Sequence, residues 1–352
     1  MLSLAMIVKN EAEKIGRCLE SVKSLVDEIV IVDTGSTDNT KEIAMSFGAR
    51  IFDYQWNNSF ADARNFSLQH CKGEWRLVLD ADEYLIRVSK DDLEEFLSNE
   101  NVVGRIKIIN CFRQDGEDKE SQAFVSRLIP KGAYFEGRIH EQVNLNLPRK
   151  NAPIEVFHDG YYQSDKTNRN VQLLQLALRE NPKDHYLLYQ IGKEFRLQKD
   201  FKKALNYFEK SYKTTTLKDR YRTQLIVEFL YACIGGNNFK KGLEIIESES
   251  NMLKSLPDFH FVCGLFYMEL VLSDIQKYLE YLPLVENSYL KCLEVGDSDK
   301  YDSVLGTGSF LAAYNLAVYY ETTGIIERAR YYYEVSSKYN YGPAILRHGK
   351  LG

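Results

Sequence analysis

The sequence has few cysteines and no pairing pattern among them. Its 352 residues hold six cysteines and six histidines, with no Cys-x-x-Cys pair and no zinc-ligand spacing between the two residue types. This argues against a structural zinc site, and we expect buried, reduced thiols. The cysteines are Cys18, Cys71, Cys111, Cys233, Cys263 and Cys292.

Long apolar runs and a large charge excess are also absent. No stretch reaches the about 18 uninterrupted apolar residues of a membrane-spanning helix. The first apolar run meets Lys9, Asn10 and Glu11, too early for a signal peptide. The net charge of -5 gives no electrostatic reason to expect nucleic acid as a partner. We therefore expect a cytoplasmic protein with no transmembrane segment and no nucleic-acid partner.

What is present is a composition ordinary for a globular protein, 44% hydrophobic and 27% charged, in a chain long enough for two domains. Its first part alternates short apolar runs with helical periodicity, which predicts a mostly parallel, Rossmann-like α/β sheet covered on both faces. The expected strands are residues 4–8, 28–32, 50–52 and 75–79, and the expected helices are residues 12–25, 39–47 and 61–71.

The pattern changes twice further along. Residues 105–109, 123–129 and 154–157 read as short strands, mixed or antiparallel, with long loops between them. After Ser164 almost all of the chain has helical periodicity. We predict a domain boundary near residue 165, which gives an α/β domain over 1–165 and an all-α domain over 166–352.

The helical part contains internal repeats of about 34 residues, the length of a tetratricopeptide unit. Residues 185–218 and 310–343 match that unit well, residues 223–249 match it partly, and a pair over about 260–295 carries an insertion. The repeat positions are Leu188, Ile191, Gly192, Phe195, Ala204, Phe208 and Ser211, then Leu316, Ala317, Tyr320, Ala329, Tyr333 and Ser336, and finally Leu230, Cys233, Gly242 and Ile246. Helix packing explains these residues, and a concave binding groove is the additional interpretation.

Residues 78–83 read Val-Leu-Asp-Ala-Asp-Glu, an apolar run that stops on two aspartates. Side chains alternate along a strand, so Asp80 and Asp82 would project from one face at a strand end and could share a divalent cation. Such a pair could hold a metal diphosphate. The alternative is a solvated turn after a strand.

Asp33 ends the apolar strand at 29–32 and begins the segment Asp-Thr-Gly-Ser-Thr-Asp-Asn-Thr. Gly35 permits a tight turn, and Thr37 or Asp38 can cap the next helix, so Asp33 is left for another role. A carboxylate there can accept the imide N–H of a uracil ring. Ligands of open α/β sheets bind beyond the carboxyl ends of the strands, where Asn10, Glu11, Asp33 and residues 80–82 all fall.

Four segments together resemble the family 2 glycosyltransferases with a GT-A fold, over roughly residues 2–165. They are Met6 to Glu11, Asp33 to Thr40, Phe60 to Asn65 and Leu79 to Glu83. Arg127 and the Arg138-Ile-His-Glu141 segment make the chain similar to a branch of that family that includes the lipopolysaccharide-core glycosyltransferases and the SunS-like peptide S-glycosyltransferases. The His158 to Tyr161 segment and the repeats after it favour the SunS-like subgroup.

The resemblance implies an inverting transferase that uses a UDP-sugar with Mn²⁺ or Mg²⁺. Carried over to this sequence, Asp82 is the principal metal ligand, and Asp80 holds the ribose or the metal. Asn10, Glu11, Asp33 and Ala81 belong to the nucleotide-sugar site. Arg64 lies near the base or the diphosphate, with a surface salt bridge as its alternative.

The resemblance also supplies candidates for catalysis. Glu141 is the expected general base and His140 a further metal or phosphate contact. His158 and Asp159 form the competing pair, with His158 also a candidate metal ligand. A thiol acceptor would need a weaker base than a hydroxyl.

We expect hexose transfer from a UDP-sugar to a Cys, Ser or Thr side chain of a peptide or protein, with the repeats recognising the acceptor or forming a dimer. One alternative is transfer to a cell-envelope saccharide or a lipid-linked glycan. The alternative of another class is a non-catalytic scaffold with a degenerate nucleotide-sugar domain. Tyr331 to Tyr333 and Tyr339 to Tyr341 could form a dimer surface, although repeat packing also explains them.

Overall fold

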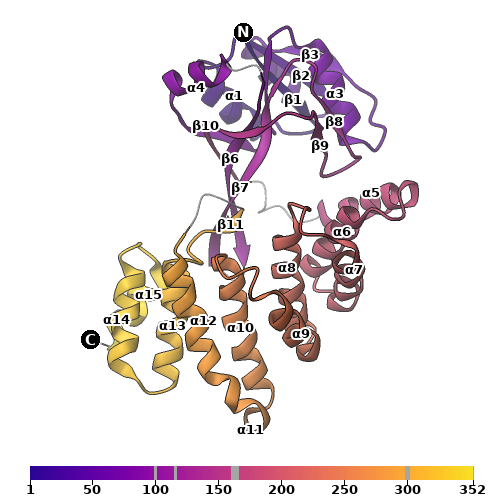
Figure 1. The fold of residues 1–352 in the computed structure, drawn as a ribbon. Helices are drawn as coiled ribbons and strands as arrows, with labels where there is room; N and C mark the ends of the chain where they lie inside the picture. The colour runs from indigo at the N-terminus through magenta and orange to yellow at the C-terminus, as the bar shows by residue number, and fades with distance from the viewer. Residues whose placement is uncertain (99–100, 115–116, 160–165, 298–301, 352) are drawn as a thin grey trace. The chain divides into compact units, whose positions relative to one another are not determined.

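The computed structural model describes residues 1–98, 101–114, 117–159, 166–297 and 302–351. The chain divides into two compact units, Met1–Ala177 and Leu178–Gly352, which are described separately (Figure 1). The predicted domain boundary near residue 165 and the Gly160–Tyr161 part of the His158 to Tyr161 segment lie outside the described residues. The boundary stays a prediction.

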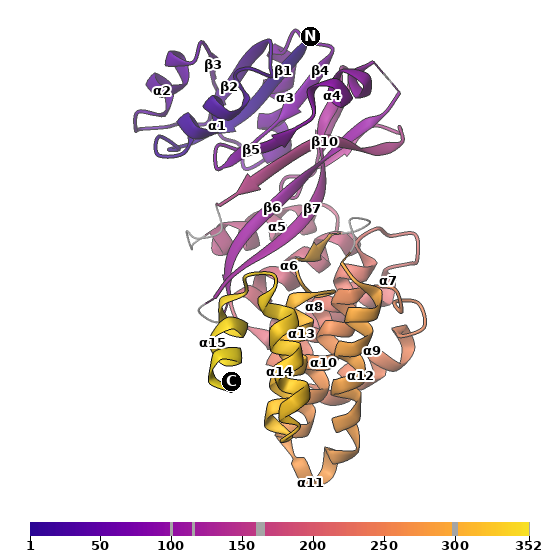
Figure 2. The ribbon, with the colours of Figure 1, turned by 90° about the vertical axis from the view of Figure 1, so that its left-hand side faces the viewer.

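The first unit is built on one mixed sheet with the strand order β3-β2-β1-β4-β7-β6-β10-β5 (Figure 2). Its first four strands in the chain are β1 (Leu2–Val8), β2 (Glu28–Asp33), β3 (Arg50–Asp53) and β4 (Trp75–Val78). β1 pairs in parallel with β2 and β4, and β2 pairs in parallel with β3. The predicted parallel beginning of the sheet is therefore confirmed.

The rest of this sheet is longer and more regular than the sequence suggested. β6 (Val103–Gln114) and β7 (Glu117–Pro130) pair antiparallel, and β7 also pairs antiparallel with β4. The predicted short strands with long loops were wrong here, because Gly104 and Lys107 lie within β6, and Asp118 and Lys119 lie within β7. β10 (Arg149–His158) lies parallel to β6 and antiparallel to β5 (Glu83–Val88). A separate hairpin pairs β8 (Tyr134–Glu136) with β9 (Gln142–Asn144).

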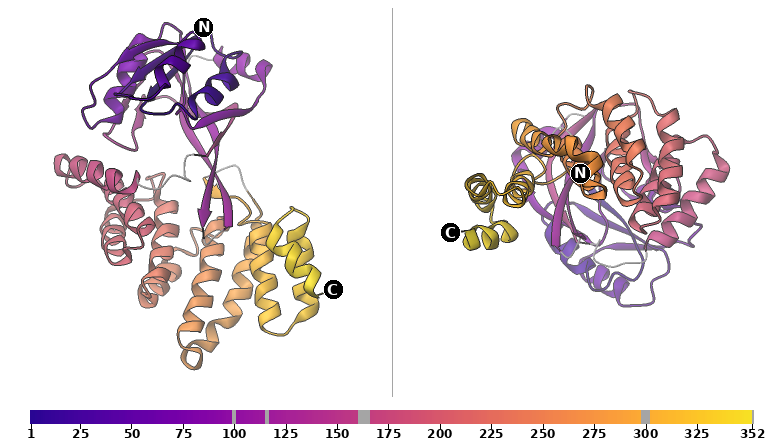
Figure 3. Two further views of the ribbon diagram at one scale, coloured as in Figure 1. Left: turned by 180° about the vertical axis from the view of Figure 1, so that it is seen from behind. Right: turned by 90° about the horizontal axis from the view of Figure 1, so that it is seen from below.

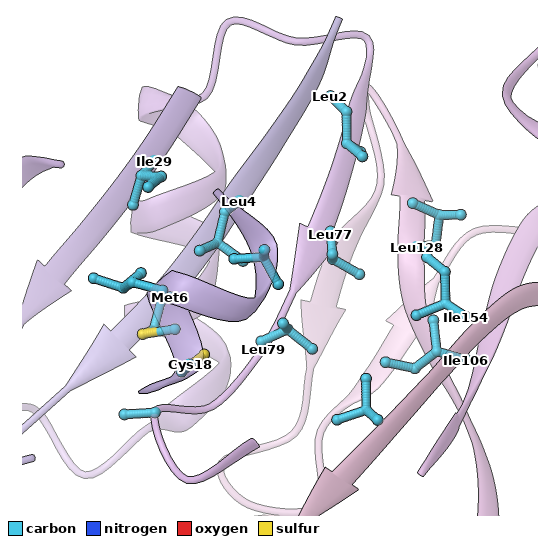
Figure 4. Close-up of a cluster of buried hydrophobic side chains, with 14 of the residues drawn as sticks. Leu2, Leu4, Met6, Cys18, Ile29, Leu77, Leu79, Ile106, Leu128 and Ile154 are labelled. Carbon is cyan, nitrogen blue, oxygen red and sulfur yellow. The ribbon is translucent and has the colours of Figure 1, made fainter. Parts of the chain in front are cut away.

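Helices cover both faces of the sheet, as predicted. Leu4 and Met6 of β1 point to one face, where they pack with Cys18 of α1 (Ile15–Val22), as Figure 4 shows. α2 (Thr40–Ser46) and α4 (Lys90–Leu97) contribute Ala44 and Leu93 to the same cluster. Ala5 of β1 points the other way and packs with α3 (Phe60–His70) and the β8–β9 hairpin. The face that α3 covers therefore also carries this hairpin.

The cysteines are free, as expected. Five of them are buried, and Cys111 is half-buried. No helix in the described parts of the chain is long and apolar enough to cross a bilayer.

The second unit consists of antiparallel helix pairs (Figures 2 and 3). It begins within α5 (Lys166–Glu180). The pairs are α6 (His185–Leu197) with α7 (Phe201–Thr214), α8 (Arg222–Gly235) with α9 (Phe239–Glu249), α10 (Pro257–Ser273) with α12 (Leu282–Val295), and α13 (Phe310–Thr322) with α14 (Ile326–Ser337). α11 (Ile275–Tyr278) and a short 3₁₀ turn (Leu279–Tyr281) form the predicted insertion, and α15 (Gly342–Leu351) follows.

Two of these pairs share a detail that supports the predicted repeat. The Ser211 hydroxyl donates to the His185 carbonyl at 2.7 Å, and the Ser336 hydroxyl donates to the Phe310 carbonyl at 2.8 Å, both across 26 residues. In each pair the end of the second helix is thus tied to the start of the first. Ser211 and Ser336, which the sequence gave as equivalent repeat positions, therefore have equivalent places in the structure.

Candidate functional site

Two of the predicted motif loops are hydrogen-bonded to each other where β1 and β2 end. The Asn10 amide N–H donates to Ser36 Oγ at 2.9 Å, and the Glu11 amide N–H donates to Thr40 Oγ1 at 2.8 Å. In return, the Thr37 amide N–H donates to Asn10 Oδ1 at 2.8 Å. Asn10 has a φ of 55°, a left-handed conformation that asparagine tolerates better than most residues. Asn10 and Glu11 are thereby brought beside the segment that follows Asp33.

Asp33 is a buried carboxylate with one oxygen in use. Its Oδ1 accepts the amide N–H groups of Gly35 at 2.9 Å and Ser36 at 2.8 Å, and the Lys41 Nζ lies 3.8 Å away. Its Oδ2 is buried and has no hydrogen-bond partner, while Asp33 as a whole is 1% exposed. A buried acceptor without a partner is costly, so this oxygen is suited to a ligand N–H.

The sequence had suggested that Asp80 and Asp82 project together from the end of a strand, and this prediction was wrong. β4 ends at Val78, and Asp80 lies in a turn that Glu83 closes by accepting the Asp80 amide N–H at 2.8 Å. Asp80 Oδ1 accepts from Arg64 Nη2 at 2.8 Å, and Asp80 Oδ2 accepts from Arg127 Nη2 at 3.0 Å. Both carboxylate oxygens of Asp80 are thus held by arginines.

Burial and the neighbouring arginines determine the ionisation of Asp80 and Glu83 in this turn. Burial by itself would raise the pKa of Asp80, but the guanidinium groups of Arg64 and Arg127 outweigh it and hold this pKa far below its ordinary value. Burial raises the pKa of Glu83, even though Arg127 Nη2 lies 3.6 Å from its Oε1. Asp80 is therefore ionised across the physiological range.

Arg64 joins Asp80 to Glu141. Its Nε donates to Glu141 Oε1, while its Nη2 binds Asp80. Arg64 is only 5% exposed, so the alternative of a helix-surface salt bridge is wrong. The Nη1 atoms of Arg64 and Arg127 are buried without hydrogen-bond partners. The cluster therefore holds donors suited to a ligand oxygen or anion.

Asp82 has a different neighbour. Its Oδ2 lies 3.4 Å from His158 Nε2, and His158 Nδ1 lies 2.9 Å from Asn110 Oδ1. Burial by itself would lower the pKa of His158, but the hydrogen bond and the charge of Asp82 outweigh it, so this pKa is raised. Ala81, between the two aspartates, is buried.

The structure separates the predicted metal ligands into different groups. Asp82 and His158 are neighbours, whereas Asp80 binds arginines. His140 lies beside Glu141 with a φ of 53°. Among the described residues, no three His, Cys, Asp or Glu side chains are grouped to hold a metal ion by themselves. A metal beside Asp82 and His158 would take further ligands from a bound molecule or from water.

His158, the last residue of β10, and Asp159, which follows it, have different partners. His158 faces Asp82, but Asp159 pairs with Arg17 Nη2 at 2.5 Å and lies 3.8 Å from Lys14 Nζ. Arg17 also covers the Tyr84 ring, with its guanidinium carbon 4.1 Å from the ring centroid. Asp159 is thus tied to α1 through Arg17.

Sequence reasoning gave no role to four residues that build this site. Arg127 and Glu83 surround Asp80, Asn110 contacts His158, and Asn65 binds the backbone of β8. Asn65, Glu83 and Arg127 belong to the motifs named in the sequence, so their roles could have been predicted from the resemblance. The role of Asn110 could not have been predicted from the sequence, because the pairing of β10 with β6 is what brings it to His158.

Known proteins resemble this chain over both parts. Residues 3–158 match the sequence model of the family described as Glycosyl transferase family 2. The TPR repeat-containing protein Synpcc7942_0270 of Synechococcus elongatus is 31% identical over 244 residues, which are 64% of this chain and 60% of that protein. The SPbeta prophage-derived glycosyltransferase SunS of Bacillus subtilis is 27% identical over 314 residues, 84% of this chain and 64% of SunS.

A third relative matches the first part alone. An uncharacterised glycosyltransferase of Rickettsia bellii is 36% identical over 118 residues, 32% of this chain and 40% of that protein. This chain therefore spans between 40% and 64% of the lengths of these three relatives. The family match, the mixed sheet and the helix pairs agree with one another. The chain carries a glycosyl transferase family 2 domain of the GT-A fold, followed by helical repeats of the tetratricopeptide type.

Proposed function

We propose that this chain is an inverting glycosyltransferase that moves a hexose from a UDP-sugar to a Cys, Ser or Thr side chain of a peptide or protein. The observation that carries the proposal is the buried, unpartnered Oδ2 of Asp33 at the carboxyl edge of the sheet. A uracil ring offers an imide N–H that a carboxylate accepts with charge assistance. Asn10 and Glu11, hydrogen-bonded to the same segment, would border the nucleoside.

The pairing of Asp82 with His158 fits a divalent cation such as Mn²⁺ or Mg²⁺. A carboxylate oxygen and an imidazole nitrogen lie 3.4 Å apart, both of them donors that Mn²⁺ accepts. Protein sites of this kind often supply one or two ligands and leave the others to substrate phosphates and water. Bound there, the metal would neutralise charge on the departing diphosphate.

The residues of the chain would then divide the remaining tasks. Arg64 and Arg127 hold Asp80 and keep it ionised, which leaves Asp80 able to accept from a ribose hydroxyl. Their buried Nη1 atoms can donate to oxygens of the donor substrate. Glu141, held by Arg64, would take the proton from the acceptor as the sugar is transferred in a single displacement. His140, next to it, would contact the phosphates.

The helix pairs of the second unit support the proposal of a peptide or protein acceptor. Tetratricopeptide-like helix pairs present stacked side chains suited to extended segments of another chain. The resemblance to SunS extends over 84% of this chain and so includes these helices. A peptide or protein acceptor therefore accounts for both parts of the molecule, whereas a saccharide acceptor leaves the repeats without a role.

The test is thermal stabilisation by nucleotide diphosphates, each with and without manganese, on the wild type, Asp82→Ala and Asp91→Ala. Asp91 is an exposed carboxylate on α4 and serves as the matched control. We expect UDP with manganese to stabilise the wild type and Asp91→Ala but not Asp82→Ala. The absence of a shift with every nucleotide would contradict the proposal and favour a non-catalytic scaffold. A shift without peptide transfer, but with transfer to a lipid-linked glycan, would correct the acceptor.

A further inference from the structure

The β8–β9 hairpin lies against α3 and carries the candidate base. Phe135 of β8 and Val143 of β9 are buried with Ala61 and Leu68 of α3. The connection between the two strands contains Gly137, with a φ of 96°, and His140, with a φ of 53°. Glu141 follows at once, before β9 begins at Gln142. The position of Glu141 therefore depends on how this hairpin is fixed to α3.

Asn65 makes a reciprocal pair of hydrogen bonds with that hairpin. Its Nδ2 donates to the Phe135 carbonyl at 2.9 Å, and its Oδ1 accepts the Phe135 amide N–H at 2.7 Å. A side-chain amide offers one donor and one acceptor in the same plane, so Asn65 binds β8 as a neighbouring strand would. One side chain thus fixes the backbone of β8 in register against the helix.

Two further contacts connect α3 with the same connection. The Phe60 amide N–H donates to the Arg138 carbonyl at 2.8 Å, and Arg64 Nε donates to Glu141. Asn65 is adjacent to Arg64 along α3. The helix therefore binds the hairpin at its first strand, in its connection and at Glu141.

We propose that Asn65 is a positioning residue that fixes the β8–β9 hairpin and, through it, holds Glu141 beside Arg64. This inference rests on the proposed function, in which Glu141 removes the acceptor proton. Catalysis by such a group depends on its geometry, and a displacement of about 1 Å can cost about 10²-fold in rate. Asp33 and Asp82, which bind the uracil and the metal in the proposed function, lie outside the hairpin, and His140 is the hairpin residue proposed to contact the donor. Loss of the Asn65 contacts should therefore lower kcat more than it lowers UDP affinity.

Two substitutions of Asn65 remove its hydrogen bonds to Phe135 to different extents. Asn65→Leu has a similar volume and removes both hydrogen bonds. Asn65→Asp keeps the bond from the Phe135 amide and loses the one to the Phe135 carbonyl. The matched control is Asn144→Leu, on β9, because the Asn144 side chain donates to Tyr134 and Glu136, within the hairpin itself.

Hydrogen exchange of the Phe135 amide measures the positioning contact without any need for activity. We expect fast exchange in Asn65→Leu, and slow exchange in Asn65→Asp, Asn144→Leu and the wild type. We also expect kcat to fall about 10-fold or more in Asn65→Leu and less in Asn65→Asp, with a smaller change in UDP affinity than in kcat in both variants. The melting temperature of each variant ensures that every rate is taken below unfolding.

Unchanged Phe135 exchange in Asn65→Leu would overturn the inference, as would a kcat within about twofold of the wild type. An equal loss of kcat in Asn144→Leu would also overturn it, since general loosening of the hairpin would then explain the effect. Fast exchange in Asn65→Leu together with no UDP binding by the wild type would support the contact and reject the proposed function alone.

Discussion

His158 Nε2 lies 3.4 Å from Asp82 Oδ2 because β10 runs antiparallel to β5 and pairs His158 with Glu83. The two residues are far apart in the sequence, and strand pairing alone makes them neighbours. Asn110 reaches the other ring nitrogen by a second pairing, that of β6 with β10. The candidate metal position is therefore a property of the completed sheet.

The first prediction concerns this pair. His158→Gln should lower the manganese-dependent affinity for UDP by about 10-fold or more, because an amide replaces an imidazole ligand. The affinity measured without metal should change little. Titration calorimetry with UDP, in manganese and in chelator, measures both. His348→Gln, on α15, is the control, and an effect of equal size there would contradict the assignment.

The second prediction concerns Asp33. Asp33→Asn keeps the Oδ1 that accepts from Gly35 and Ser36, but it places an N–H₂ group at the position of Oδ2, which is proposed to accept from the uracil. UDP affinity should fall by about 10-fold or more, since a charge-assisted hydrogen bond is lost and two donors now meet. The preference for UDP over CDP should shrink, because cytosine has an acceptor at that ring nitrogen.

The matched control for Asp33 is Asp53→Asn. Asp53 ends the neighbouring strand, its side chain is 80% exposed, and it pairs with Lys41 at 2.5 Å. We expect this variant to bind UDP within about twofold of the wild type, as is usual for an exposed ion pair. Retained UDP selectivity in Asp33→Asn would show that the uracil binds elsewhere.

The third prediction separates the two candidate bases. Glu141→Gln should preserve UDP affinity and slow transfer by about 10² or more, the usual contribution of a general base. Asp159→Asn, which loses a contact with Arg17, should transfer at close to the wild-type rate. Single-turnover kinetics at saturating donor distinguishes them. The opposite pattern, with Asp159→Asn slow and Glu141→Gln normal, would place the base after β10.

The fourth prediction concerns repeat packing. A Cβ added at Gly192 would lie 2.6 Å from ring atoms of Phe208, which is fully buried. Gly192→Ala should therefore lower the free energy of unfolding by about 1–3 kcal/mol through overpacking. Gly349→Ala, in α15 with nothing within 4 Å of the added Cβ, should stabilise slightly because alanine favours a helix. Denaturant unfolding of both variants provides the comparison.

The fifth prediction concerns Asp258, a buried residue in the first turn of α10. The Thr307 hydroxyl donates to its Oδ1 at 2.6 Å, yet burial raises its pKa from 3.8 to about 7. Because the folded-state pKa is the higher one, the protonated form favours folding. The stability this provides is complete below about pH 3.8 and is lost as the pH rises to about 7.

Asp258→Asn should remove that loss, since its Oδ1 can still accept from Thr307. Its advantage in melting temperature over the wild type should grow from about pH 4 to about pH 7 and then remain constant. Thermal unfolding across this range measures it, with Glu247→Gln on the exposed side of α9 as the control. A constant difference at all pH values would mean that Asp258 does not titrate as described.

Much of the fold was predictable because local patterns determine it. The strand at Leu2–Val8 is a continuous apolar run, and the helix at Ile15–Val22 buries one regular stripe, so both were found within a few residues of their ends. The helix pair of residues 185–218 was predictable because Gly192 and Ser211 fit only opposite particular neighbours. Asp33 was chosen as a candidate because it ends an apolar strand and is not needed as a helix cap, whereas Arg64 was chosen from the family resemblance.

The remainder depends on register and on long-range pairing. Nothing local in the sequence indicates that β5 would lie at the sheet edge beside β10, or that β6 and β7 would form one long hairpin. The alternation argument for Asp80 and Asp82 failed because β4 ends at Val78. Their different partners, arginines for one and His158 for the other, come from elements that fold onto the turn from elsewhere in the chain.

The network around Arg64 also has a consequence for protein synthesis. Arg64 and Asp80 are 16 residues apart in the sequence. Glu141 lies 77 residues after Arg64, and Arg127 lies 47 residues after Asp80. On the ribosome, the first four strands emerge well before these partners do. A nascent chain that stops before residue 127 contains the Arg64–Asp80 pair but neither Arg127 nor Glu141, so the buried charge network is still incomplete. The domain should therefore acquire its stable structure late in translation, as one cooperative unit.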